Sequence, residues 1–228
     1  MGTFRYGQTE TLVELNQIIL GDCLEVMKDI PDKSVDLVLT DPPYNVDKDY
    51  NEYKDDLDII QYGKWCFDWF YQLQRISNTV LITIGTVNQN LWNGISVPTY
   101  KYIWYKDNTT QAGKFSQMAL YEPIYFYGSL IKKPKKDLFR CSIVLQKAAS
   151  FHVCPKPLKL WKDLIDNFSN PSQTVLDIFS GSATTAIACL ELNRNFICIE
   201  KDPMYHELSV KRVNDYKSQM KMKFAEAV

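Results

Sequence analysis

The sequence predicts an α/β fold with a mainly parallel sheet and helices on both faces. Short apolar runs alternate along the 228 residues with longer segments whose apolar residues have helical spacing. Three of these runs end in polar or turn-forming groups: Asp41-Pro-Pro-Tyr, Ser180-Gly-Ser and Glu200. Alternating strands and helices favour a parallel sheet covered on both sides, and such sheets bind ligands at the carboxyl ends of their strands.

The first half of the chain is predicted to alternate between strands and helices. Residues 16–20 form a short apolar strand that stops at Gly21-Asp22, and 24–30 have helical spacing up to Pro31. The strand at 35–40 ends at two prolines, which cannot continue a central strand. The polar, acidic residues 45–58 are expected to be a mobile loop. A helix rich in aromatic residues at 57–76 and a buried strand at 79–84 follow.

The second half is predicted to begin with a hairpin and to return to alternating elements. Strands are expected at 100–105 and 120–127, and the basic residues 132–146 are expected to be irregular. The later elements are a helix at 158–168, a strand at 174–179, an Ala-rich helix to about 192, a strand at 195–200 and a helix from 204.

Composition excludes several classes of protein. Lys and Arg total 26 and Asp and Glu total 27, so the net charge of -1 argues against nucleic-acid binding by bulk charge, though not against a local basic face. No apolar run approaches the ~20 residues that span a bilayer, and the N-terminus lacks a signal pattern. We therefore expect a cytoplasmic protein without a membrane segment. Six cysteines without a C-x-x-C pair and two histidines predict neither disulfides nor a metal site.

One candidate motif is the strand-to-turn-to-helix segment from Asp177 to Thr185. Its small residues offer backbone N–H groups and a helix N-terminus to an anionic group. Glu200 follows about 20 residues later, at the end of the next strand, where an acid reaches ribose hydroxyls in dinucleotide-type folds. The G-x-G-x-x-G pattern fails because Ala183 replaces its second glycine. A tight turn without a ligand is an equal reading of this motif taken alone.

The second motif is Asp41-Pro42-Pro43-Tyr44. A carboxylate and a proline-fixed carbonyl can each accept one N–H of an exocyclic amine, whose nitrogen lone pair is otherwise delocalised into the base. A tyrosine ring offers a face on which a flipped base stacks. The alternative is a double-proline turn beside an unrelated tyrosine.

Together, these motifs resemble the S-adenosylmethionine-dependent amino-methyltransferases of DNA, which modify adenine N6 or cytosine N4. The matches run from about residue 17 to 213. They comprise Gly21-Asp22-Cys23-Leu24-Glu25, Ser34 to Asn45, Trp104-Tyr-Lys106, Tyr121-Glu-Pro-Ile124, His152-Val-Cys-Pro-Lys-Pro157, Asp177 to Ser182, and Ile199-Glu200 with Tyr205 and Arg212. The catalytic motif precedes the cofactor motif, as in the β order of this family. Asp rather than Ser before Pro-Pro-Tyr favours adenine by family habit.

The resemblance implies a Rossmann-like methyltransferase fold with a seven-stranded sheet and one antiparallel hairpin strand, a single domain over 1–228, and S-adenosylmethionine as cofactor. The implied catalytic residues are Asp41, Pro42, Pro43 and Tyr44. The implied cofactor-binding residues are Asp22, Cys23, Asp41, Lys156, Pro157, Asp177, Phe179, Ser180, Gly181, Ser182, Thr184, Thr185 and Glu200. Two residues depart from the family pattern: Ala183 stands where Gly is usual, and Val153 where Pro follows His.

Charge is segregated along the chain. Residues 131–162 hold nine basic residues against one acid, a net +8, whereas 41–70 hold eight acids against three lysines, a net -5. Beside a base-modifying site, the basic run favours a phosphate-binding face. Candidate recognition segments are 45–58, 106–118 and 129–147. Candidate DNA-binding residues are Lys106, Lys114, Lys132, Lys133, Lys135, Lys136 and Arg140.

The resulting hypothesis is a DNA adenine-N6 methyltransferase that acts on a flipped-out base. Alternatives that keep the chemistry are cytosine N4, RNA adenine or a protein glutamine as substrate. Alternatives of another class are a non-catalytic DNA-binding subunit and a nicotinamide dehydrogenase, although the second leaves Asp41-Pro-Pro-Tyr44 unexplained. Because family members are often dimers, a homodimer is an open expectation.

Overall fold

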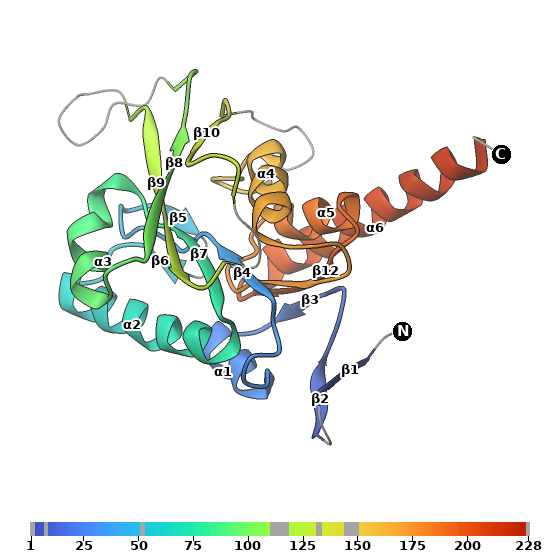
Figure 1. Cartoon of the computed structure of the whole chain (residues 1–228), viewed down its shortest axis with the longest axis horizontal. Coiled ribbons are helices and arrows are strands. Elements are labelled where there is room, and N and C mark those ends of the chain that lie inside the picture. Colours follow the sequence, from blue (N-terminus) through green and yellow to red (C-terminus); the bar gives the residue numbers. More distant parts are fainter. Residues whose placement is uncertain are drawn as a thin grey trace.

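The chain folds around one central sheet with helices on both sides (Figure 1). The computed structural model describes residues 3–6, 9–50, 53–109, 119–130, 134–143 and 151–226. Within these residues the sheet has eight strands in the order β10-β8-β9-β7-β4-β11-β12-β3. β9 runs antiparallel to both neighbours, and the other neighbouring pairs are parallel. The predicted fold class is confirmed, with one strand more than predicted.

The strands of this sheet are mostly short apolar runs. They are β3 (Gln17–Leu20), β4 (Leu37–Thr40), β7 (Thr79–Thr83), β8 (Tyr100–Tyr105), β9 (Tyr121–Gly128), β10 (Leu138–Arg140), β11 (Thr174–Asp177) and β12 (Asn195–Glu200). The central strands β4, β7 and β11 are buried at every residue, as expected for parallel strands covered on both faces. Two small hairpins lie outside the sheet: β1 (Thr3–Tyr6) with β2 (Thr9–Glu14), and β5 (Asp49–Tyr50) with β6 (Tyr53–Lys54).

The helices divide between the two faces of the sheet (Figure 1). On one face lie α1 (Cys23–Val26), α2 (Ile59–Ile76) and α3 (Gln89–Ile95), together with the 3₁₀ turns η1 (Met27–Asp29) and η2 (Thr86–Asn88). On the other face lie α4 (Leu158–Phe168), α5 (Thr184–Glu191) and α6 (Pro203–Glu226). None of the helices in the described ranges is long and apolar enough to cross a membrane.

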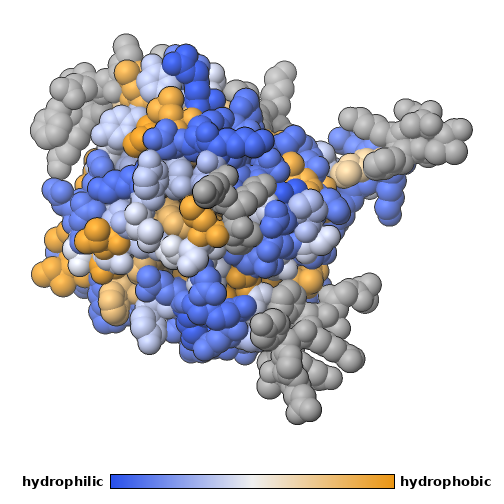
Figure 2. Space-filling view, viewed as in Figure 1, coloured by the Kyte–Doolittle hydropathy of each residue, from blue (hydrophilic) through white to orange (hydrophobic). Residues whose placement is uncertain are grey.

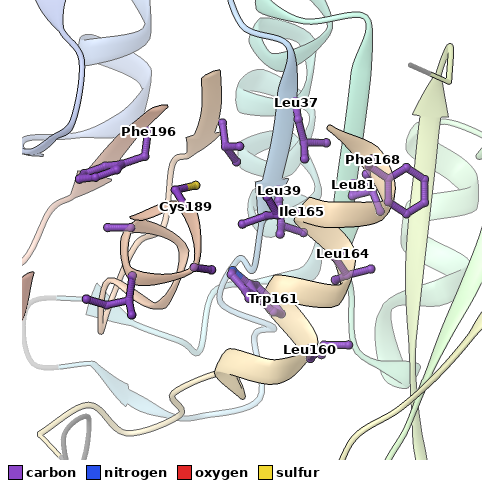
Figure 3. Close-up of a cluster of buried hydrophobic side chains, with 14 of the residues drawn as sticks. Leu37, Leu39, Leu81, Leu160, Trp161, Leu164, Ile165, Phe168, Cys189 and Phe196 are labelled. Carbon is purple, nitrogen blue, oxygen red and sulfur yellow. The ribbon is translucent and has the colours of Figure 1, made fainter. Parts of the chain in front are cut away.

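The core consists of two layers, one on each face of the sheet. Strand β4 shows the alternation, because Leu37 and Leu39 pack in one layer and Val38 in the other. Figure 3 shows the first of these layers, where side chains of α4 point toward the leucines of β4 and β7. On the surface, Figure 2 shows hydrophobic residues in small separate groups among hydrophilic ones, which is ordinary for a folded chain.

Three sequence expectations need correction. The eighth strand, β10, lies in the segment predicted to be irregular, and it pairs with β8 through Phe139, whose ring is buried. The helix at 89–95 was missed because it is short and contains Asn and Gly, which are weak helix formers. Residues 45–58 were expected to be a mobile loop, yet Asp55 is 1% exposed and organises hydrogen bonds across the segment.

Strand register brings the polar strand ends together. Leu176 of β11 pairs with Val38 of β4, Asp177 with Cys198 of β12, and Glu200 with Leu20 of β3. Because these strands are parallel, Gly21, Asp41, the turn at 178–183 and Glu200 follow at one edge of the sheet.

Candidate active site

A pocket lies at this edge of the sheet. Most of the residues predicted to bind the cofactor line it: Asp22, Cys23, Asp41, Lys156, Asp177, Phe179, Ser180, Gly181, Ser182, Thr184, Thr185 and Glu200, with Pro43 beside them. Trp65, Trp161 and Asp202 also line the pocket and were not predicted, whereas His152 and Tyr205, which line it too, belong to the matched motifs but were not predicted as site residues. Pro42, Tyr44 and Pro157 are not lining residues; Tyr44 contacts Asp41, and Pro157 is the N-cap residue of α4.

Two residues of the turn after β11 have a left-handed backbone conformation. Gly181 has φ +47°, and a Cβ at this position would lie 2.6 Å from Nε2 of His152. Ala183 adopts the left-handed conformation, φ 59°, at the N-cap of α5, where the family pattern has glycine. Arg212 on α6 donates to the Ser182 carbonyl at 2.5 Å. A side chain at 181 would therefore require a shift of His152 and a backbone conformation that favours glycine, while Ala183 is accommodated in a conformation that glycine adopts more readily.

Glu200 ties the end of β12 to this turn. Its Oε2 accepts from the Gly181 N–H at 2.7 Å and its Oε1 from the Asp202 N–H at 2.9 Å. Burial raises the pKa of the Glu200 carboxyl, although these two backbone N–H groups oppose the shift. Asp22 plays a comparable structural part, since it caps α1 through the Leu24 N–H at 2.9 Å and pairs with Lys201 at 3.1 Å.

Asp177 joins three elements beneath the pocket. It accepts from the hydroxyl of Thr40 at 2.8 Å, from the hydroxyl of Thr185 and from the Phe179 N–H at 3.1 Å. Burial raises its pKa to about 6, against the opposing effect of these donors. Trp161 on α4 donates to Thr185 at 2.7 Å, so β4, β11, α4 and α5 meet in one buried network.

Asp41, at the start of the double-proline turn, receives three side-chain donors. The Tyr44 hydroxyl donates to its Oδ1 at 2.6 Å, and the Thr83 hydroxyl donates to the same oxygen. The Lys156 ammonium donates to its Oδ2. Lys156 thus contacts the catalytic-motif carboxylate, a contact that the sequence did not predict.

Glu122, which was given no role in the sequence analysis, lies next to this group. Lys106 donates to its Oε1 at 2.9 Å, and the Lys156 ammonium lies 3.8 Å from its Oε2. The Tyr44 hydroxyl is 3.2 Å from the same Oε2. Burial opposes ionisation of Glu122, but Lys156 and Lys106 outweigh it and lower the pKa of the carboxyl. The ammonium of Lys156 is likewise buried, but Asp41 and Glu122 raise its pKa. Two carboxylates and two ammonium groups therefore form one charged cluster.

The backbone of the double-proline turn is fixed from outside. The Tyr62 hydroxyl donates to the Pro43 carbonyl at 2.7 Å, and Asn88 donates to the Tyr44 carbonyl at 2.8 Å. The ring of Tyr44 packs on Gly85, where a Cβ would lie 2.8 Å from the ring. Helix α2 and turn η2 therefore position the motif, and no sequence pattern identified Tyr62 or Asn88.

The predicted DNA-binding residues do not form one exposed group. Lys106 is 3% exposed and paired with Glu122, so its ammonium is not available to a phosphate. Lys135, Lys136 and Arg140 are exposed. Lys114, Lys132 and Lys133 lie outside the described residues, as do 110–118, 131–133 and 144–147 of the candidate recognition segments. Lys136 and Lys159 both lie near Asp163, at 3.4 and 3.0 Å, and Lys162 pairs with Glu191, so acids beyond the segment neutralise part of its +8 charge.

Comparison with known sequences finds consistent similarity. A family model for N6/N4 methyltransferases, described as DNA methylase, matches residues 35–136 and 98–211. The type II methyltransferase M2.MboI of Moraxella bovis is 27% identical, over 92% of each chain. The DNA adenine methyltransferase YhdJ of Escherichia coli K12 is 26% identical, over 88% of this chain and 83% of its own.

Comparison with solved structures finds the same fold. The cytosine-N4-specific PvuII DNA methyltransferase has a TM-score of 0.71 at 18% identity, over 86% of this chain and 85% of its own. A complex of M1.HpyAVI with S-adenosylmethionine has a TM-score of 0.67 at 24% identity, over 87% and 98%. At these identities the likeness demonstrates a shared Rossmann-like fold.

Proposed function

The chain belongs to the N6/N4 DNA methylase family, whose model matches residues 35–136 and 98–211, and on this premise we propose that it methylates N6 of adenine in DNA. The observation that carries the proposal is the placement of Asp41 at the edge of the pocket formed by Gly181, Ser182 and Glu200. A carboxylate able to hold an amine thus lies beside a turn able to hold a cofactor.

The pocket suits S-adenosylmethionine, the cofactor of this family. The Ser180 hydroxyl is buried and has no hydrogen-bond partner in the described part of the chain, which leaves it for a polar group of a ligand. Asp22, Glu200 and Asp202 supply carboxylates, and Trp65, Ile178 and Phe179 supply apolar surface. S-adenosylmethionine is a cation that carries a flat base and a sugar. The carboxylates of the pocket suit its charge and its sugar hydroxyls, and the apolar residues suit its base.

The residues of the chain act mainly by positioning. When bound, S-adenosylmethionine supplies an electrophilic methyl group. We propose that the target base flips out of the duplex, that Asp41 and the Pro42 carbonyl each accept one N–H of its amine, and that Tyr44 stacks on its face. These acceptors orient the nitrogen and stabilise the positive charge that develops on it. The proton leaves afterwards, to Asp41 or to water.

Adenine is favoured over cytosine by two observations. Asp, rather than Ser, precedes Pro-Pro-Tyr at 41, and one relative that matches along most of both chains is named a DNA adenine methyltransferase. Cytosine N4 remains the second candidate, since a cytosine-N4-specific enzyme shares the fold. Both substrates present a primary amine to the same acceptors.

We propose further that the whole chain is one catalytic domain and that DNA lies against Lys135, Lys136 and Arg140. Lys114, Lys132 and Lys133 extend this candidate face in sequence. Recognition of the target is assigned to 45–58, 106–118 and 129–147. Homodimer formation is kept as a proposal that sedimentation of the purified protein tests.

The deciding experiment is methylation of a mixed pool of unmethylated DNA with labelled cofactor, followed by mass spectrometry of the nucleosides. N6-methyladenine is expected. N4-methylcytosine would move the assignment to the second candidate. Label transferred to RNA or to a protein glutamine, and not to DNA, would overturn it.

A further inference from the structure

Lys156 occupies two of the three contacts that the mechanism assigns to the target base. Its ammonium donates to Oδ2 of Asp41, where an amine N–H of the base is to bind. It also lies 5.1 Å from the centroid of the Tyr44 ring, over the face on which a base is to stack. The Tyr44 ring also packs on Gly85, where a Cβ would lie 2.8 Å from it. A base cannot take these contacts while the ammonium holds them.

Glu122 is the group to which this ammonium can turn. Its Oε2 lies 3.8 Å from the Lys156 ammonium, about 1 Å beyond the usual length of a charged hydrogen bond. Glu122 is itself fixed by Lys106, whose ammonium is 2.9 Å from Oε1 and which is almost fully buried. A small rotation of the lysine side chain therefore exchanges Asp41 for Glu122 as its partner.

We propose that Lys156 is a placeholder for the target amine and that Glu122 is the positioning residue that receives it when the base arrives. The proposal rests on the proposed methyl transfer at Asp41. It explains a part-buried glutamate that the transfer itself does not use. It also gives the part-buried Asp41 carboxylate a cation until the base arrives, when an unpaired charge there would be costly.

The pairing of charges supports the exchange. Lys156 has carboxylates on both sides, and these raise its pKa, so it stays an ammonium in either position. Glu122 keeps the Lys106 partner throughout and stays ionised, because the two lysines lower its pKa. The cluster is neutral before and after the movement, so the exchange requires no proton.

A double-mutant cycle tests the proposal through the single-turnover methylation rate at saturating DNA and cofactor. Glu122→Gln leaves Lys156 held by Asp41 alone, and the rate is expected to fall roughly tenfold to hundredfold, the value of one charged hydrogen bond. In a Lys156→Met background the same Glu122→Gln change is expected to alter the rate less than about threefold, because no ammonium remains to be moved. Cofactor affinity, measured by calorimetry, is expected to stay within about twofold for Glu122→Gln.

Matched controls are Glu207→Gln and Lys64→Met, both at exposed positions away from the pocket. If Glu122→Gln leaves Lys106 unpaired and fails to fold, Lys106→Met/Glu122→Gln replaces it in the cycle. An equal loss from Glu122→Gln in both backgrounds overturns the proposal, and so does complete inactivity of Lys156→Met, since the ammonium would then be needed for the transfer. Failure of the proposed function appears differently, as a wild-type protein that methylates no DNA.

Discussion

Asp41 is the residue on which the proposed chemistry of the site depends. Its Oδ1 accepts from Tyr44 and Thr83 and its Oδ2 from Lys156, so the carboxylate is held in one orientation before any substrate is present. Such pre-organisation avoids the cost of ordering the acceptor when the base binds. None of these donors lies on the turn at 178–183 that we propose binds the cofactor.

Asp41→Ala is therefore expected to abolish methyl transfer while leaving cofactor binding largely intact. Loss of the acceptor removes orientation of the amine, and a decrease in rate of at least about a thousandfold is expected. Methylation with labelled cofactor measures the first effect and calorimetry the second. Asp68→Ala, at a half-buried aspartate on α2 that pairs with Lys64, is the control. Normal methylation by the Asp41 variant would refute the catalytic assignment.

Asp177 is a second carboxylate, and its burial affects the pH dependence of stability. It is fully enclosed by the strand ends, its donors are two threonine hydroxyls and one backbone N–H, and burial raises its pKa from 3.8 to about 6. A raised pKa in the folded state means that folding favours the protonated acid. The contribution of Asp177 to stability is therefore full below pH 3.8 and is lost as the pH rises through about 6.

Asp177→Asn is expected to remove this pH dependence. Between pH 4 and 7 the unfolding free energy of the wild type should fall, relative to that of the variant, by up to about 3 kcal/mol. Chemical denaturation at several pH values measures both curves. Parallel curves for the two proteins would show that Asp177 does not titrate in this range.

At the scale of elements, the segment 45–58 illustrates how one side chain orders a polar stretch. Asp55 accepts from the backbone N–H groups of Asn45, Val46 and Lys48, at 2.6, 2.9 and 3.3 Å. Asn45 in turn exchanges hydrogen bonds with the backbone of Leu57 at 2.7 and 2.8 Å. These bonds close the segment into a loop that continues directly from Tyr44.

Asp55→Ala is expected to release this loop. Three backbone N–H groups lose their acceptor, which costs about 1–3 kcal/mol in stability. Hydrogen exchange of amides 45–48 should accelerate, and the methylation rate should fall because the loop adjoins Tyr44. Asp56→Ala, at the neighbouring exposed residue, should change neither quantity. Unchanged exchange in the Asp55 variant would show that the loop is held by other contacts.

Element prediction succeeded where one physical signal dominated. The buried runs at 35–40, 79–84 and 195–200 and the helical spacing at 158–168 correspond to β4, β7, β12 and α4. Prediction failed for β10, because two of its three residues are exposed. This segment is a strand because it pairs with β8. Pairing partners that are distant in sequence leave no local signal.

At the scale of the whole molecule, the basic residues that lie close together in the sequence do not form one positive surface in the structure. Of the nine basic residues in 131–162, Lys156 is directed into the pocket and Lys136, Lys159 and Lys162 lie near acids. Arg140 is exposed and lies over the Tyr105 ring, and Lys135 is exposed as well. The candidate phosphate-binding face is thus narrower than the linear count suggested.

Replacement of Lys135, Lys136 and Arg140 by Ala together is expected to lower DNA affinity and to reduce its salt dependence. Each phosphate contact adds about one to the slope of log affinity against log salt, so the slope should fall by up to about three. Fluorescence anisotropy between 50 and 200 mM salt measures this slope, because affinity for DNA changes strongly with salt over that range. Lys64→Ala should leave the slope unchanged. A triple variant with the wild-type slope would place the DNA elsewhere.

The sequence by itself determined the class of fold, the strand ends that carry polar residues, and the Asp41-Pro-Pro-Tyr44 and Asp177–Thr185 motifs, because hydrophobic periodicity and turn chemistry act over a few neighbouring residues. Only the tertiary structure decided the partners of those residues. The contact between Lys156 and Asp41 joins residues 115 positions apart in the sequence. The contact that buries Lys106 against Glu122 joins residues 16 positions apart. Such contacts depend on how strands order and helices pack, and this follows from the fold as a whole and not from any local pattern.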